Sequence, residues 1–168
     1  SIKGIWCVPL YSNPTGAIYS DECVTRLAKM KTAAKDFQIF WDNAYCVHHL
    51  YKKHTLLNIY REAEKYGTTD RILYFASTAK ITYPGSAVSI IASGDKNIAE
   101  IKERLKLQIF SHDKINQMRH VKYLKSPQHI AEHMEDVAAL IRPKFDYVDD
   151  TLRNDIPYED LLTWFKPD

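Results

Sequence analysis

Five side chains in this sequence have the types and the order that covalent chemistry on a small molecule requires. They supply an amine, a carboxylate, a phenol, an amide and a hydroxyl: Lys80, Asp42, Tyr45, Asn13 and Ser77. Each of them follows closely on a short apolar run that predicts a β-strand. Ligands in open α/β sheets bind outside the carboxyl ends of the strands, so we expect these side chains to converge on one site.

The lysine is the centre of this predicted site. An amine held at a strand end and partly removed from water is a nucleophile toward aldehydes, which points to a Schiff base at Lys80. An aldehyde cofactor with a pyridine ring needs a carboxylate at its ring nitrogen, and Asp42 supplies one. Asn13 and Tyr45 can donate hydrogen bonds to a phenolate oxygen on the same ring, and Ser77 can bind a phosphate.

Three segments around these residues resemble the fold type I pyridoxal-phosphate-dependent aminotransferases. The first two of these segments, taken with their flanking residues, are most similar to the subgroup of type Ic aspartate aminotransferases. The resemblance implies pyridoxal 5'-phosphate as the cofactor. The matching segments are Ser-Asn-Pro-Thr-Gly at 12–16, Trp-Asp-Asn-Ala-Tyr at 41–45, and Ser-Thr-Ala-Lys at 77–80 followed by Pro84 and Gly85.

The resemblance also implies a role for each residue. Lys80 would form the Schiff base and move a proton at the substrate's α-carbon, and Asp42 would bind the pyridine nitrogen. Asn13 and Tyr45 would contact the phenolate oxygen, and Ser77 the phosphate. The implied reaction moves an amino group between an L-amino acid, with aspartate as one candidate, and a 2-oxo acid. Two alternatives stay open: a lyase or decarboxylase of the same fold, and the aminotransferase-like effector domain of a transcription regulator.

The sequence departs from the family pattern in two ways. Many relatives carry a phosphate-binding arginine shortly after the Pro-Gly pair, whereas residues 86–88 read Ser-Ala-Val, so phosphate binding must rest elsewhere. The resemblance also covers only the middle of such proteins. We therefore expect the full-length protein to be an enzyme and a homodimer, and this chain alone to show little or no turnover.

The elements that must position the site follow from hydrophobic patterning. Apolar runs at 4–8, 37–41 and 72–76 predict strands, and the run at 87–92 predicts a further, buried strand. Between them, Ser20 is expected to cap one helix, and Thr55 a second that Gly67 ends. Alternating strands and helices predict an α/β fold with a mainly parallel sheet flanked by helices.

From Asp95 onward the pattern predicts only helices. Two of them carry apolar faces over 98–109 and 115–124, and a third begins at Ser126 and Pro127, with Pro143 expected to kink or end it. We predict that residues 1–125 form the second half of a cofactor-binding large domain. Residues 126–168 are then a connecting helix and the start of a small domain, whose core would include the aromatic residues Tyr147, Tyr158, Trp164 and Phe165.

Composition narrows the function classes. The chain has 168 residues, 45% of them hydrophobic, and a formal net charge of +2, which argues against nucleic-acid binding. No apolar run is long enough to cross a membrane, and no signal peptide is visible. The cysteines Cys7, Cys23 and Cys46 form no CxxC pair, which predicts reduced thiols in a cytoplasmic protein. The histidine pair at 129 and 133 and the cluster at 48–54 lack further partners, so we predict no metal site.

Overall fold

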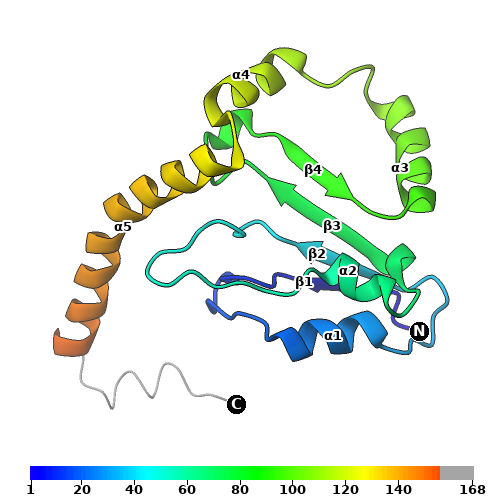
Figure 1. Cartoon of the computed structure of the whole chain (residues 1–168), viewed down its shortest axis with the longest axis horizontal. Coiled ribbons are helices and arrows are strands. Elements are labelled where there is room, and N and C mark those ends of the chain that lie inside the picture. The colour runs from blue at the N-terminus through cyan, green and yellow to red at the C-terminus, as the bar shows by residue number, and fades with distance from the viewer. Residues whose placement is uncertain (156–168) are drawn as a thin grey trace.

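A four-stranded sheet forms the centre of the molecule (Figure 1). The computed structural model describes residues 1–155. The strands lie in chain order: β1 (Gly4–Cys7), β2 (Gln38–Asp42), β3 (Ile72–Ser77) and β4 (Ser89–Ala92). The first three are parallel and β4 is antiparallel to β3, so the prediction of a mainly parallel sheet is confirmed.

One face of the sheet is covered by two helices, α1 (Asp21–Lys29) and α2 (Ile59–Glu64). Apolar side chains that are spaced two apart along a strand share a face, and here they meet the apolar stripes of the helices. This contact is the hydrophobic core. Its central members come from β1, β2, β3, α1 and α2: Cys7, Ile39, Trp41, Ile72, Val24, Ala28, Ile59 and Ala63.

Helix α1 begins where the sequence predicts. The Ser20 hydroxyl accepts a hydrogen bond from the Cys23 amide at 3.1 Å, and Asp21 and Glu22 lie in the first turn. We expect Ser20→Ala to lower the free energy of unfolding by about 1 kcal/mol, because one amide of the first turn loses its acceptor. Urea unfolding measures this change. The matched Ser20→Asn variant keeps a capping oxygen, so an equal loss in both variants would contradict the assignment.

The predicted start of the second helix is wrong. Asn58, not Thr55, is the cap, and its side-chain oxygen accepts from the amides of Tyr60 and Arg61 at 3.0 and 3.1 Å. The chain before it is held elsewhere, since the Leu57 amide donates to the Asp21 carboxylate at 3.0 Å. Thr55 therefore lies in the segment that precedes α2, and this segment passes the start of α1 before α2 begins.

The last strand also differs from its prediction. Only Ser89–Ala92 of the run at 87–92 is a strand, and it is largely exposed rather than buried. It lies at the edge of the sheet and pairs only with β3. The run is apolar, but the helices that bury the central strands pack over β1, β2 and β3.

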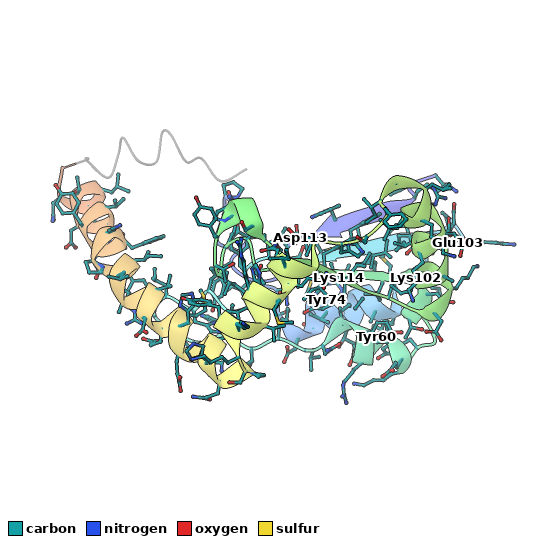
Figure 2. All side chains as sticks on the ribbon, turned by 90° about the horizontal axis from the view of Figure 1, so that it is seen from above. Tyr60, Tyr74, Lys102, Glu103, Asp113 and Lys114 are labelled. Atoms are coloured by element: carbon teal, nitrogen blue, oxygen red, sulfur yellow. The ribbon has the colours of Figure 1, made fainter. Side chains whose placement is uncertain are left out.

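The second half of the chain is helical, as predicted. It contains α3 (Asp95–Gln108), α4 (Lys114–Leu124) and α5 (Pro127–Asp155), and neither α3 nor α4 has a buried residue. Figure 2 shows α5, in yellow and orange, leading away from the sheet. The predicted α5 cap is confirmed, since the Ser126 hydroxyl accepts from the His129 amide at 3.1 Å.

Helix α5 continues through Pro143 to Asp155 and bends between its yellow and orange parts (Figure 1), so the proline does not end the helix. Of the aromatic residues predicted to join the small-domain core, Tyr147 lies in α5 and is exposed in the described part of the chain. The others, Tyr158, Trp164 and Phe165, lie outside the described residues. The domain boundary at 125/126 stays a prediction. None of the helices in residues 1–155 is both long and apolar enough to cross a membrane.

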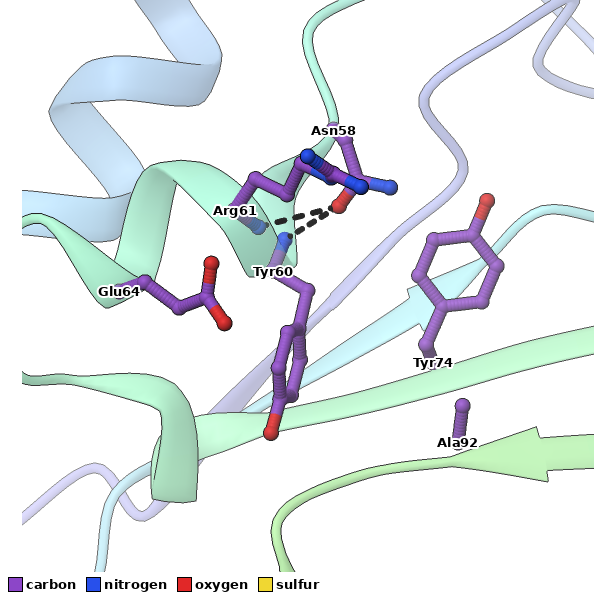
Figure 3. A pocket seen from close by; sticks show the side chains of 6 residues that line it. All are labelled: Asn58, Tyr60, Arg61, Glu64, Tyr74 and Ala92. Atoms are coloured by element: carbon purple, nitrogen blue, oxygen red, sulfur yellow. Dashed lines mark hydrogen bonds between the residues drawn. The ribbon is translucent and has the colours of Figure 1, made fainter.

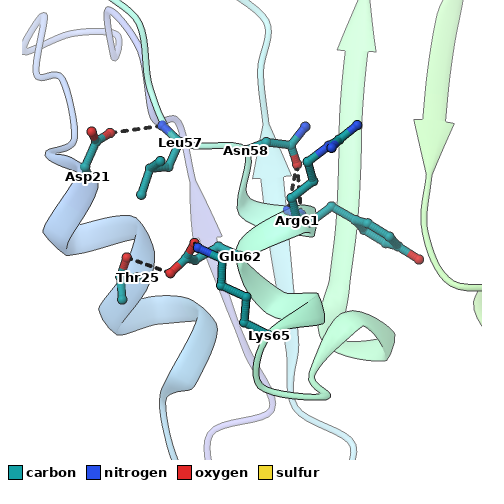
Figure 4. A network of polar contacts seen from close by, with 8 residues as sticks. Asp21, Thr25, Leu57, Asn58, Arg61, Glu62 and Lys65 are labelled. Atoms are coloured by element: carbon teal, nitrogen blue, oxygen red, sulfur yellow. Dashed lines mark hydrogen bonds and ion pairs between the residues drawn. The ribbon is translucent and has the colours of Figure 1, made fainter.

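A buried carboxylate links the two helices that cover the sheet (Figure 4). Glu62 is only 5% exposed. It accepts a hydrogen bond from the Thr25 hydroxyl at 3.0 Å and pairs with the Lys65 amine one turn along α2. The hydrogen bond from Lys65 is the main cause that lowers the pKa of Glu62, burial opposes it, and the bond from Thr25 adds to it. The ionised form is therefore the one that the fold stabilises.

This lowered pKa makes stability depend on pH in one direction. Glu62 contributes fully to folding above its ordinary pKa of 4.5, and the contribution is lost as the pH falls below that value toward the folded-state pKa. We expect the free energy of unfolding, measured in urea from neutral pH downward, to fall in this acidic range. The same curve for Glu62→Gln should be flatter there, and two parallel curves would contradict the role of this carboxylate.

Candidate active site

Two of the predicted site residues lie on the sheet face opposite the core. Asp42 is in register with Phe75, and Ser77 follows two residues later on the same face. The Asp42 carboxylate accepts a hydrogen bond from the Trp6 indole at 3.2 Å. The rings of Trp6, Phe40 and Phe75 stack on this face, with centroids 5.3 to 6.2 Å apart. The Asp42 carboxylate therefore lies beside this row of stacked aromatic rings, at the carboxyl ends of the strands.

Two others line a cavity of about 580 Å³ between the loops that follow β1 and β2 and the first half of α5. Asn13 comes from the first loop and Tyr45 from the second, together with His48 and His49. The wall contributed by α5 is mainly apolar: Met134, Val137, Ala138, Ile141 and Phe145. The cavity is large enough to hold a small aromatic ligand.

Lys80 contacts one of these residues, Tyr45. Its amine lies 4.7 Å from the centroid of the Tyr45 ring, a cation–π contact. The side chain is exposed, so the expectation that it is partly removed from water is not met. The reason is its place in a turn beyond the end of β3, which α1 and α2 do not cover. Lys80 and Tyr45 meet, whereas no hydrogen bond or ion pair joins Lys80 to Asp42 within residues 1–155.

The hydroxyl of Ser77 has a partner of its own. It accepts a hydrogen bond from the Ala79 amide at 3.1 Å, which fixes the start of the turn that carries Lys80. Its hydrogen is left to donate to another acceptor, as phosphate binding would require.

The far wall of the cavity holds a neutral histidine. Burial lowers the pKa of His49, and the nearby Lys53, His54 and His48 lower it further. A neutral ring can accept at Nδ1, where the Tyr11 hydroxyl lies 2.6 Å away. Tyr11 has a positive φ of 49°, a strained conformation for a residue with a side chain, and its hydrogen bond to His49 helps to fix it there.

A second cavity, of about 560 Å³, lies beside α2 and the edge of β4 (Figure 3). None of the predicted site residues lines it. The side-chain oxygen of Asn58, one of its polar groups, is already occupied as the cap of α2. The carboxyl edge of the sheet, where the predicted residues lie, remains the candidate site.

The cysteines and histidines behave as packing and hydrogen-bonding groups. Cys7, Cys23 and Cys46 are free, and burial raises the pKa of the Cys7 and Cys46 thiols. No group of three or more His, Cys, Asp or Glu side chains in the described part of the chain is arranged to hold a metal ion.

The donor set fits pyridoxal phosphate chemically. A ring nitrogen needs a carboxylate, a phenolate oxygen needs donors, and an aldehyde needs an amine; Asp42, Asn13 with Tyr45, and Lys80 are of these types. Sequence reasoning missed Trp6, the hydrogen-bond partner of Asp42. The alternation of β1 contains the signal, because it places Trp6 on the same face as its register partner Phe40.

Comparison with known proteins points to one family. The model of the aspartate amino-transferase family matches residues 1–168. A Mycolicibacterium smegmatis protein named as an aminotransferase is 40% identical over 99% of this chain, and an aspartate aminotransferase of Corynebacterium glutamicum is 33% identical over 99%. The chain spans 39% of the length of each of these relatives.

Solved structures give the same result. The crystal structure of an aspartate transaminase from Corynebacterium glutamicum has a TM-score of 0.87 at 34% identity, over 92% of this chain and 37% of that one. An aminotransferase from Corynebacterium diphtheriae has a TM-score of 0.86 at 37% identity, over 90% of this chain and 38% of that one. On the match to its whole length, the chain belongs to the aspartate amino-transferase family.

Proposed function

We propose that this chain supplies the lysine and the ring-binding residues of a pyridoxal-phosphate-dependent aminotransferase. The full-length protein would move an amino group between an L-amino acid and a 2-oxo acid. The observation that carries the proposal is the meeting of the Lys80 amine with the Tyr45 ring beside the carboxyl ends of three parallel strands. The family and the two named relatives favour amino transfer over the lyase and regulator hypotheses.

The cofactor, when bound, supplies an aldehyde and a pyridinium ring that accepts the electrons of the substrate's α-carbon bond. The chain's own residues do the rest. Lys80 would hold the cofactor through its amine and would carry a proton to and from the substrate's α-carbon. Asp42 would hold the ring nitrogen through a charge-assisted hydrogen bond, and the Trp6 indole N–H, which donates to that carboxylate, would fix its orientation.

Two hydrogen-bond donors would act on the phenolate oxygen of the cofactor ring. The Asn13 amide and the Tyr45 hydroxyl would donate hydrogen bonds to the phenolate oxygen, which draws electron density toward it. Ser77 would donate its remaining hydrogen to the phosphate. Aspartate is our candidate amino donor, on the strength of the family and of the relative in Corynebacterium glutamicum.

The test is covalent capture of the cofactor. The chain is mixed with pyridoxal phosphate, reduced with borohydride and digested, and the modified peptides are mapped by mass spectrometry. We expect the label to concentrate on Lys80, with the exposed Lys29 of α1 as the internal reference. Equal labelling of both lysines, in this chain and in the full-length protein, would overturn the proposal.

Three finer points belong to the same proposal. The full-length protein is a homodimer in the cytoplasm, and it uses neither nucleic acid nor a membrane as a partner. This chain alone has little or no turnover, because it spans 39% of the length of its relatives. An assay with L-aspartate and a 2-oxo acid, run on the chain and on the full-length protein, checks the last point.

A further inference from the structure

Three histidines from three different parts of the chain contact the turn that carries Lys80. We define the lysine turn as Thr78–Thr82; the amides of Ile81 and Thr82 donate to the Thr78 carbonyl at 3.0 and 2.9 Å. His48 reaches it from the loop after β2, His120 from α4 and His133 from α5. These contacts cross 32 to 52 residues of sequence. They tie the turn to three elements other than its own strand.

His133 is held in one tautomer by its two partners. Its Nε2 lies 2.8 Å from the Ile81 carbonyl, which only accepts, so the ring proton is on Nε2. The Tyr123 hydroxyl lies 3.3 Å from Nδ1 and donates to it. A chain of hydrogen bonds therefore runs from Tyr123 of α4 through His133 of α5 to the lysine turn.

His120 is held in the opposite tautomer. Its Nδ1 lies 2.9 Å from the Asn116 carbonyl, so the proton is on Nδ1 and Nε2 accepts. The oxygen of the Thr78 hydroxyl already accepts from the Val88 amide at 2.9 Å, so this hydroxyl can donate to Nε2, which lies 2.9 Å from it and 3.0 Å from the Thr82 hydroxyl. His120 thus joins the first residue of the lysine turn to α4.

The third contact is at the lysine itself. The Nε2 of His48 donates to the Lys80 carbonyl at 3.0 Å, and its ring packs edge-on against Tyr45 with centroids 5.6 Å apart. His48 therefore links the backbone of Lys80 to the ring that the Lys80 amine contacts.

We propose that His48, His120 and His133 are positioning residues that fix the lysine turn, and through it the direction of the Lys80 amine. The proposal rests on the proposed function for the role of Lys80, but the hydrogen bonds that carry it do not involve the cofactor. An exposed lysine has many rotamers, so the rate of a reaction at its amine rises when the backbone that carries the side chain is held in one conformation.

The first test measures the tautomers. Long-range proton–nitrogen NMR spectra of the chain, at a pH where the rings are neutral, should show His48 and His133 protonated at Nε2 and His120 at Nδ1. Tyr123→Phe removes the donor at Nδ1 of His133 and should leave His120 unchanged. A His133 protonated at Nδ1, or a His120 protonated at Nε2, would overturn the proposal.

The second test compares two substitutions of His133. His133→Gln keeps a donor at the position of Nε2, whereas His133→Asn places its donor nearer the backbone and cannot reach Ile81. We expect His133→Asn to raise hydrogen exchange at the Ile81 and Thr82 amides roughly fivefold, the factor that one neutral hydrogen bond contributes, and His133→Gln to restore protection. The amide of Ala28 in α1 is the control for global loosening.

The same pair then separates this proposal from the proposed function. Capture of pyridoxal phosphate at Lys80, relative to Lys29, should fall roughly fivefold in His133→Asn and recover in His133→Gln, since one hydrogen bond is lost and regained. Equal capture in the two variants, with exchange at Ile81 also equal, would refute the positioning role. If neither the unsubstituted chain nor the full-length protein shows a preference for Lys80, the proposed function fails, and the exchange and tautomer results still decide the histidine contacts.

Discussion

Full-length protein with Lys80→Ala is expected to lose amino transfer, with kcat lowered at least roughly 10²- to 10⁴-fold, the contribution of a positioned proton-transfer group. The loss would follow from two roles in one side chain, because the amine would both hold the cofactor and carry the proton at the α-carbon. The measurement is the rate of amino transfer from L-aspartate to a 2-oxo acid at saturating concentrations of both.

Two matched variants make this result specific. Lys80→Arg keeps the positive charge near the Tyr45 ring, 4.7 Å away in the native chain, but offers no nucleophilic amine, so it should be as inactive as Lys80→Ala. Lys29→Ala removes an exposed lysine from the last turn of α1 and should leave kcat unchanged. Activity retained in Lys80→Arg would mean that the charge matters and that the covalent role is wrong.

The elements that the sequence predicts well are those whose signals are local. A capping serine before an amphipathic stretch predicts α1, and its cap is confirmed by the hydrogen bond from Cys23 to Ser20. Short apolar runs predict β1, β2 and β3, and helices between them predict their parallel pairing. These features depend on residues within a few positions of one another, so a single sequence contains them.

The predictions that failed depend on what lies across the molecule. Thr55 and Asn58 are both good caps for α2. The Asp21 carboxylate decides between them, because it accepts a hydrogen bond from the amide of Leu57, which lies 36 residues later in the sequence. The run at 87–92 is as apolar as a core strand, yet its burial depends on a covering layer that the pattern of the strand does not reveal. The local sequence predicts these elements, and contacts between residues far apart in sequence decide where each one begins and whether it is buried.

The candidate site shows the same division. The residue types and their order after each strand predict that Asn13, Asp42, Tyr45, Ser77 and Lys80 gather at one edge. Asn13 and Tyr45 share the cavity and Lys80 contacts Tyr45, whereas Asp42 and Ser77 do not line that cavity. The hydrogen bond from Trp6 to Asp42 and the three histidine contacts on the lysine turn join residues that are 32 to 52 positions apart. Spacing along the chain gives no signal for such pairs.

The largest expected effect on stability comes from a substitution in the core between the sheet and helices α1 and α2. Ile72 is fully buried in β3, where its register partner is Ile39 of β2. Ile72→Ala removes three carbon atoms from the packed core, so the free energy of unfolding should fall by about 2–5 kcal/mol, whereas Ile72→Val removes one and should cost about 0.5–1.5 kcal/mol.

The neighbouring strand offers a matched control for this prediction. Ile90 of β4 is 57% exposed, so the same truncation there should cost about 0.5 kcal/mol or less. Urea unfolding of the three variants orders them directly. If Ile90→Ala proved as costly as Ile72→Ala, β4 would be covered in solution, and its description as an exposed edge strand would be wrong.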